Sequence, residues 1–160
     1  MMCISRRVLA VGFCVVCLAA VAAFASEPPR PGPRDRCAVC GMFVAAYPNW
    51  VAAIELEHGR HLFFDGPKDM FRFLLEPEKY ARGEDLDRDD VERIWVTDYY
   101  TTRMIDATTA FFVVGSDVTG PMGPELVPMA TREAAESFKA DHGGDRILAF
   151  ADVTSDAVRP

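Results

Sequence analysis

The first half of the chain alternates between two spacings of apolar residues. Residues 50–56 and 60–64 are rich in β-branched and aromatic side chains on either side of the pair His58-Gly59, and this pattern predicts a hairpin of two strands. Apolar residues then recur at helical spacing over 66–75, with a proline in the first turn, which predicts a helix. Residues 91–99 return to a strand pattern after a charged loop. The predicted order is strand, strand, helix, strand.

The second half repeats this order. Residues 107–115 form an apolar run typical of a strand, and residues 125–129 predict a shorter strand after a Gly- and Pro-rich loop. Thr131 then opens a helix that ends at the pair Gly143-Gly144, and residues 146–153 predict the closing strand. We therefore expect an α+β fold built from two tandem ββαβ units.

The N-terminal segment does not belong to this fold. Arg6 and Arg7 precede an apolar run and then a stretch of small residues, which is the order found in secretory signal peptides. We expect residues 1–25 to be cleaved off before Ser26, so that the protein is exported.

Two cysteines within the apolar run, Cys14 and Cys17, are preceded by Phe13 and Val16. A lipoprotein signal places Gly or Ala before its modified cysteine instead. We therefore expect a soluble protein in the periplasm or another extracytoplasmic space, without a lipid anchor. An uncleaved signal would leave an apolar stretch barely long enough to tether the protein to a membrane.

The mature chain is expected to hold a linker and one domain. Residues 26–36 are rich in proline, which excludes helix and sheet and predicts an extended spacer. Residues 37–160 suffice for one compact domain, with halves at about 37–100 and 101–160. Removing the signal takes two of the 17 basic residues and none of the 24 acidic ones, so the net charge falls from −7 to −9. Such an acidic chain has no footprint for nucleic acid, and we expect a monomer.

Beyond the signal peptide, the only two cysteines stand in the sequence Cys37-Ala38-Val39-Cys40-Gly41-Met42. Thiolate and thioether sulfur bind Cu(I) in preference to carboxylate oxygen, whereas Zn(II) is seldom bound by methionine. Gly41 has no side chain and lets the backbone bend, so that the sulfur atoms of Cys40 and Met42 can face one point. The spacing predicts a Cu(I) site, with Cys37 as a second thiolate or as a disulfide partner when metal is absent.

Other methionines extend or limit this set. Met122 lies in the Gly- and Pro-rich loop, where it can serve as a further thioether ligand or as a gap-filling core residue. Met42 has the same two interpretations, and its place in the cysteine motif favours the ligand. The remaining methionines of the domain have apolar neighbours in the sequence and are therefore expected in the core. They are Met70, Met104 and Met129.

Two other kinds of site fit part of the pattern. Cys37 and Cys40 make a Cys2His2 set for structural zinc with His58 and His61, although the spacing differs from that of a zinc finger. A CxxC motif also occurs in thiol-disulfide oxidoreductases, but there it opens a helix after a strand, whereas here it precedes every predicted strand. Asp65 is expected to cap the first helix, with a supporting role beside the metal as the alternative.

The order of several motifs resembles the NosL family. These motifs are the cysteine sequence 37–42, Phe63-Phe64-Asp65 before a helix, Ala110-Phe111-Phe112-Val113 with Gly115-Ser116, and Gly120-Pro121-Met122-Gly123. The resemblance covers roughly residues 36–152 and implies a fold of two ββαβ units similar to the organomercurial lyases. The single close cysteine pair does not suit the lyase reaction, which needs separated cysteines and an acid.

NosL proteins are described as accessory to nitrous oxide reductase. The resemblance implies a copper metallochaperone, not an enzyme, that binds one Cu(I) at positions Cys40, Met42 and Met122. It would deliver the ion to a copper-accepting cuproenzyme, or to the maturation complex of that enzyme at the membrane. A low-coordinate sulfur site suits this role because it leaves a position open to the acceptor's ligand. Many members are lipoproteins, so the missing lipoprotein signal is a departure from the family pattern.

Overall fold

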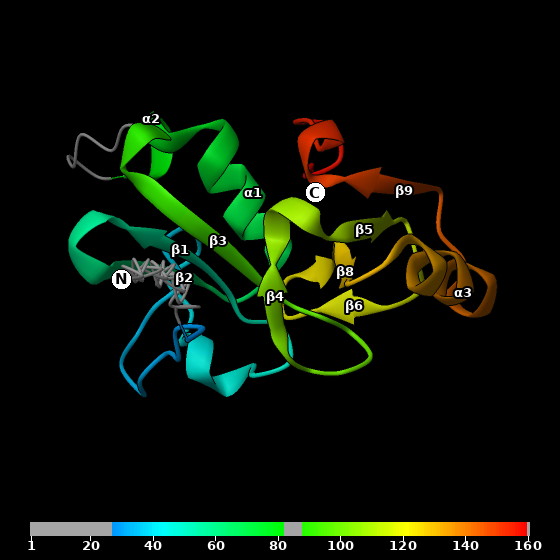
Figure 1. Ribbon diagram of the computed structural model, residues 1–160, viewed down its shortest axis with the longest axis horizontal. Helices are drawn as coiled ribbons and strands as arrows, with labels where there is room; N and C mark the ends of the chain where they lie inside the picture. The colour runs from blue at the N-terminus through cyan, green and yellow to red at the C-terminus, as the bar shows by residue number, and fades with distance from the viewer. Residues whose placement is uncertain (1–26, 82–87, 160) are drawn as a thin grey trace, which may run out of the picture.

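The structure, a computed structural model, describes residues 27–81 and 88–159. The predicted signal peptide, residues 1–25, lies outside these residues. The two larger β-sheets lie side by side, and each has a helix of its own (Figure 1). Within the described ranges, no helix has the length and apolar character needed to cross a membrane.

The first sheet is antiparallel, with the strand order β2-β1-β3-β4. Its strands are β1 (Ala52–Leu56), β2 (Arg60–Phe64), β3 (Val91–Thr97) and β4 (Met104–Asp106). The central strand β1 is buried along its length except for Glu55, as its apolar sequence requires. Helix α1 (Pro67–Leu75) follows β2 and buries Met70, Phe71 and Phe73 in the core beside this sheet, and the short helix α2 (Pro77–Tyr80) extends it.

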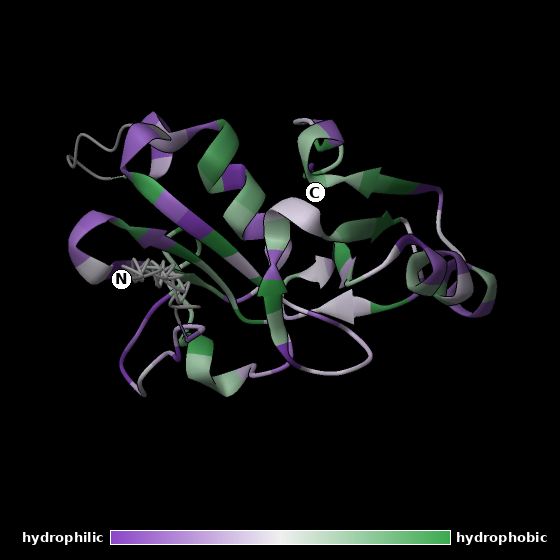
Figure 2. Ribbon diagram, viewed as in Figure 1, coloured by the Kyte–Doolittle hydropathy of each residue, from purple (hydrophilic) through white to green (hydrophobic). Residues whose placement is uncertain are grey.

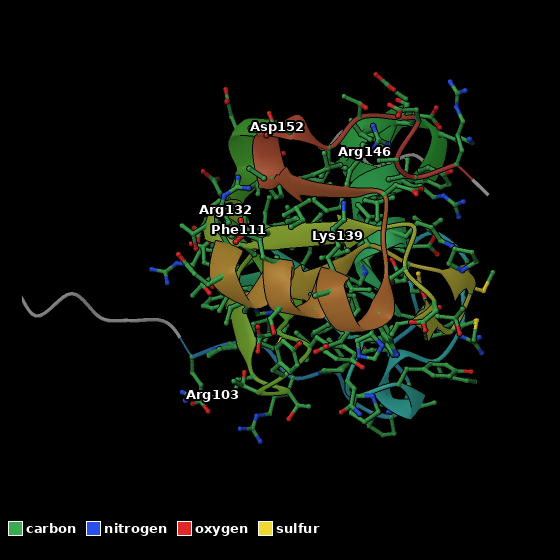
Figure 3. All side chains as sticks on the ribbon, turned by 90° about the vertical axis from the view of Figure 1, so that its right-hand side faces the viewer. Arg103, Phe111, Arg132, Lys139, Arg146 and Asp152 are labelled. Atoms are coloured by element: carbon green, nitrogen blue, oxygen red, sulfur yellow. The ribbon has the colours of Figure 1, made fainter. Side chains whose placement is uncertain are left out.

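The second sheet is also antiparallel, with the order β8-β5-β9. It consists of β5 (Phe111–Val114), β8 (Val127–Met129) and β9 (Arg146–Ala149), and a separate two-stranded ribbon joins β6 (Thr119–Gly120) to β7 (Gly123–Pro124). Helix α3 (Arg132–His142) packs against β5 and β8 and faces the viewer in Figure 3. There the guanidinium of Arg132 lies 4.8 Å from the centre of the Phe111 ring.

The two halves share one topology, as the sequence predicted. In each half the first strand is central, the second and third strands flank it, and the helix connects the flanking strands. Thr131 caps α3 as expected, because its hydroxyl accepts a hydrogen bond from the Ala134 N–H at 3.1 Å. The α+β fold of two ββαβ units is therefore confirmed.

Several elements differ from the prediction. Strand β4 was not predicted, and although it lies after residue 100 it pairs with β3 in the first sheet. The loop predicted over 116–124 contains the β6–β7 ribbon. Strand β5 begins later than expected because Asp106 accepts a hydrogen bond from the Thr108 N–H at 2.8 Å and caps a short 3-10 helix. The 3-10 helices are Val44–Ala46, Glu57–Gly59, Arg88–Asp90, Ala107–Thr109 and Phe150–Asp152.

The core consists of two clusters of buried side chains. The larger joins the first sheet and α1 to one face of the second sheet, where Phe71 meets Phe112, and the smaller lies between the second sheet and α3. Met70 and Met129 are fully buried, and Met104 packs partly buried against the larger cluster, so the prediction that these methionines belong to the core is confirmed. Figure 2 shows hydrophobic residues along β5 and β9, whereas α3 has a largely hydrophilic surface. This distribution matches a helix that covers its sheet with one face only.

The proline-rich segment does not form the spacer that the sequence predicted. Pro29 is buried, and the Asp35 side chain accepts a hydrogen bond from the Gly32 N–H at 2.7 Å. The Asp35 carbonyl also accepts from the Val44 N–H at 3.1 Å. The prolines remove backbone donors, but side-chain and turn hydrogen bonds still fix this segment on the domain.

Candidate metal centre

The cysteine motif forms a closed loop on the edge of the first sheet. The Cys37 N–H donates to the Met42 carbonyl at 2.8 Å, and the Gly41 N–H donates to the Cys37 carbonyl at 2.9 Å. Gly41 has φ +79°, a conformation that other residues rarely adopt. The Ala38 N–H donates to the Phe63 carbonyl at 3.0 Å and fixes the loop to the end of β2. The turn at Gly41 is thus present as expected.

Both thiols meet carboxylates that come from the start of α1. The Cys40 thiol donates to Asp65 Oδ1 at 3.3 Å, and the Cys37 thiol donates to Asp69 Oδ2 at 3.4 Å. Asp65 directly follows β2, and Asp69 lies in the first turn of α1. One ligand atom from each of these four residues lies within 4.8 Å of the others, so the group has the size of a metal site.

The surroundings keep both thiols protonated at neutral pH. Burial raises the pKa of the Cys37 thiol far above its ordinary value, and the Asp65 carboxylate adds to this effect. Burial also raises the pKa of Cys40 to about 11, again with a contribution from Asp65. Both cysteines are free, without a disulfide. Without a bound cation, these sulfur atoms therefore hold their protons.

Asp65 and Asp69 differ in how their negative charge is compensated. Asp69 Oδ1 accepts a hydrogen bond from Arg72 at 3.0 Å, so its charge has a partner. Asp65 is 1% exposed, and its Oδ2 atom is buried without a hydrogen-bond partner. A buried carboxylate oxygen without a donor is costly, and a bound cation would remove that cost.

The prediction that Asp65 caps α1 is wrong. The cap position is Gly66, which offers no side chain, and the Asp65 carboxylate is directed to Cys40 instead. The N–H groups in the first turn of a helix have no acceptor within the helix. The N–H of Lys68 donates instead to Glu125 Oε1 at 2.6 Å, so a residue of the second half supplies a hydrogen-bond acceptor for the start of α1. The Asp65 carboxylate is therefore not needed as a helix cap and can accept the hydrogen bond from the Cys40 thiol.

Met122 stands at the tip of the β6–β7 ribbon, and 45% of its surface is exposed. This exposure excludes the interpretation as a core residue. Its backbone carbonyl accepts a hydrogen bond from Lys68 Nζ at 3.1 Å, so the ribbon adjoins the first turn of α1. Met42 is half-buried in the cysteine loop.

The structure thus brings Cys37 and Cys40 together, and it places both predicted thioether residues on loops that adjoin the start of α1. The sequence reasoning missed Asp69. Its one local signal is its place in the first turn of the predicted helix, because Asp65 precedes the cap residue Gly66 and the four-residue spacing rule of a helix does not reach it.

The two alternative sites gain no support from this geometry. Among the described residues, the metal-capable group that holds both cysteines contains no histidine. His58 lies exposed in the β1–β2 turn, and the His61 ring stacks on Phe63 at 6.0 Å. Oxidoreductase cysteines need a lowered pKa, whereas burial raises the pKa of both thiols here. The cysteine loop also precedes β1 rather than opening a helix.

Comparison with known proteins agrees with this geometry. The family model NosL matches residues 28–158. The copper-binding lipoprotein NosL of Stutzerimonas stutzeri is 30% identical over 127 residues, which cover 79% of this chain and 66% of the relative. The protein of the same name from Achromobacter cycloclastes is 34% identical over 127 residues, which cover 72% of this chain and 61% of the relative. The chain therefore spans slightly less than two thirds of the length of both relatives.

A solved structure extends the comparison to the fold. The crystal structure of the copper chaperone NosL from Shewanella denitrificans matches 81% of this chain and 97% of its own chain, with a TM-score of 0.68 and 26% identity. These relatives are named for copper binding or copper chaperoning and not for catalysis, which agrees with the prediction of a non-enzyme. Because the family model covers most of the sequence and the fold agrees, the chain belongs to the NosL family.

Proposed function

We propose that this protein is an exported metallochaperone that binds one Cu(I) and passes it to a cuproenzyme of the nitrous oxide reductase type. The observation that carries the proposal is the group of two thiols and two carboxylates, buried except for the partly buried Cys40, in which both thiols belong to the loop that bears Met42. The names of the relatives, copper-binding lipoproteins and a copper chaperone, support copper as the metal.

The donor set favours Cu(I) over harder ions. We propose Cys40 and Met42 as the principal ligands, with Cys37 as a second thiolate and Met122 as a further thioether. Sulfur donors of this kind select Cu(I) from the metals available to an exported protein. The carboxylates contribute mainly through their charge, since a thiolate beside Asp65 is unfavourable until a cation arrives.

Binding then amounts to an exchange of the protons on the ligand thiols for a copper ion. A ligand thiol must lose its proton to bind a metal, and the raised pKa of Cys40 makes that loss costly when no cation is present. Asp65 Oδ1 lies 3.3 Å from the Cys40 sulfur and accepts its hydrogen bond, so it is the group to which the thiol proton passes first. Because protons compete with the ion for sulfur, the site holds copper without trapping it.

Release needs access for the acceptor's ligand. Cys40 and Met42 are only partly buried and Met122 is exposed, so a partner can approach the sulfur atoms from the loop side. The acidic chain would attract a basic acceptor surface and make the encounter sensitive to salt. We expect direct ligand exchange in a docked complex of one chaperone molecule with its acceptor.

Export to an extracytoplasmic space is part of the proposal. The signal-peptide pattern of residues 1–25 supports it, and so does the word lipoprotein in the names of both curated relatives. Delivery to nitrous oxide reductase rests on the family resemblance. Copper transfer to that enzyme, measured by stopped-flow, should be faster than loss of copper to a small chelator of equal thermodynamic pull.

Competition for Cu(I) against a chromophoric chelator tests the ligand set on reduced protein. Cys40→Ser should abolish tight binding because it removes the charged donor. Met42→Leu should weaken binding by about tenfold, which corresponds to about 1.4 kcal/mol. Met129→Leu, at a buried methionine of the second core, is the matched control and should bind as the wild type does. Unchanged Cu(I) affinity of Cys40→Ser, or displacement of copper by zinc at the same concentration, would contradict the proposal.

A further inference from the structure

The first turn of α1 contacts both loops that carry sulfur. Asp69 in this turn, and Asp65 just before it, accept hydrogen bonds from the two thiols. Lys68, the neighbour of Asp69, contacts the ribbon that carries Met122. These contacts link residues of the two ββαβ units through a single helical turn.

Lys68 makes the link with both its main chain and its side chain. Its N–H donates to Glu125 Oε1, while its ammonium group donates to the carbonyls of Met122, at 3.1 Å, and of Pro124. The residue is only 4% exposed. A buried ammonium group is costly without acceptors, so these two carbonyls cannot move away unless the charge is hydrated in another way. The ribbon is thereby held at a fixed distance from α1.

Glu125 completes the link from the other side. Its Oε1 atom accepts from the N–H groups of Lys68 at 2.6 Å and of Leu126 at 3.0 Å. Two glycines leave room for this carboxylate, since a Cβ on Gly66 would lie 2.2 Å from Glu125 Oε2 and a Cβ on Gly120 would lie 3.1 Å from it. The base of the ribbon is therefore packed against the start of α1 and is not free to slide.

We propose that Lys68 and Glu125 are positioning residues, which hold the ribbon that bears the exposed Met122 against the first turn of α1, next to the residue that contacts the Cys37 thiol, so that the Met122 thioether completes the copper site. The inference rests on the proposed function, because it requires Met122 to be a ligand. Ordering the ribbon before copper arrives removes part of the entropy cost of binding, since the backbone that carries the thioether is already fixed to the start of α1. Without the link, the exposed tip of the ribbon would have to be ordered by the ion itself.

A double-mutant cycle on Cu(I) affinity tests the inference in the full chain. Lys68→Leu removes the ammonium group without adding a metal ligand, and it should weaken Cu(I) binding by the same factor as Met122→Leu, about tenfold. In the Met122→Leu background, Lys68→Leu should have no further effect. Lys68→Arg keeps a charged donor and should restore most of the affinity. Lys79→Leu, at an exposed lysine of α2, is the matched control and should leave the affinity unchanged.

X-ray absorption supplies a second measurement that a general loss of stability would not reproduce. Copper bound to Lys68→Leu should lose one sulfur neighbour relative to the wild type, as it should in Met122→Leu. Urea unfolding identifies variants that do not fold, and Lys68→Gln, which keeps a shorter polar side chain, takes the place of Lys68→Leu if that variant fails.

The outcomes separate the inference from the proposed function. If Met122→Leu weakens binding but Lys68→Leu does not, or if the two effects add, the positioning role is overturned while the copper site stands. If Met122→Leu binds as the wild type does, both the positioning role and the assignment of Met122 as a ligand fall. If Cys40→Ser keeps tight binding, the proposed function itself fails and the inference with it.

Discussion

Replacing Glu125 with glutamine should reduce the dependence of the protein's stability on pH. The carboxylate is buried against the start of α1, and burial raises its pKa to about 7 despite the two N–H groups that donate to it. Glutamine keeps the shape of the side chain and an oxygen that can accept the Lys68 N–H, but it carries no charge. The variant therefore removes the ionisation and leaves most of the packing in place.

The sign and size of the effect follow from proton linkage. The pKa of Glu125 is about 7 in the folded protein and 4.5 as a reference for the unfolded chain. Between these values the folded state binds more protons than the unfolded state, so this group lowers the free energy of unfolding as pH rises toward 7. At about 1.4 kcal/mol per pH unit, the wild type loses roughly 2 to 3 kcal/mol between pH 5 and pH 8 through this residue. The glutamine variant loses none of that contribution.

Urea unfolding of reduced protein at the two pH values measures the difference. The stability of Glu125→Gln relative to the wild type should rise by about 2 to 3 kcal/mol from pH 5 to pH 8. Glu136→Gln, at an exposed residue of α3, is the control for the loss of one carboxylate, and its offset from the wild type should stay constant. A constant offset for Glu125→Gln as well would refute the reasoning, because Glu125 would then titrate alike in both states.

Three further predictions concern the metal centre and its support. Because burial raises the pKa of Cys40 to about 11 and that of Cys37 as well, Cu(I) affinity measured by chelator competition should rise about tenfold per pH unit near neutrality for each thiolate that binds, and a flat profile would mean that the thiolates are already formed. Asp65→Asn removes a carboxylate that raises this pKa, so the thiolate ultraviolet absorbance of Cys40 should appear at lower pH, and an unchanged titration would contradict the contact. Gly66→Ala should lower the free energy of unfolding in urea by about 1 to 3 kcal/mol, because the new Cβ would meet Glu125. Gly32→Ala, whose Cβ would have its nearest contact at 3.5 Å, is the control and should leave that free energy almost unchanged. Equal losses of stability in the two variants would argue against the close packing at Gly66.

The sequence by itself determined the order of the elements, and it placed both cysteines and Met42 in one loop. Period-two and helical spacings are local properties, so the strands, the helices and the Thr131 cap could be predicted from neighbouring residues. The turn at Gly41 and the closeness of Cys37 to Cys40 follow from spacing within one loop. Short strands such as β4 escaped prediction because three residues carry too little periodicity.

The tertiary structure alone decided which side chains surround the sulfur atoms. Cys40 and Asp65 are 25 positions apart, and Lys68 and Glu125 are 57 positions apart, so no local pattern relates them. The Asp65 carboxylate had two possible donors, the N–H groups at the start of α1 and the Cys40 thiol. In the folded protein Glu125, from the second half, accepts the N–H of Lys68 at the start of α1, and Asp65 accepts from the thiol. Folding resolved this competition because burial favours the arrangement that leaves the fewest polar groups without partners, and only the packed chain shows which partners are within reach.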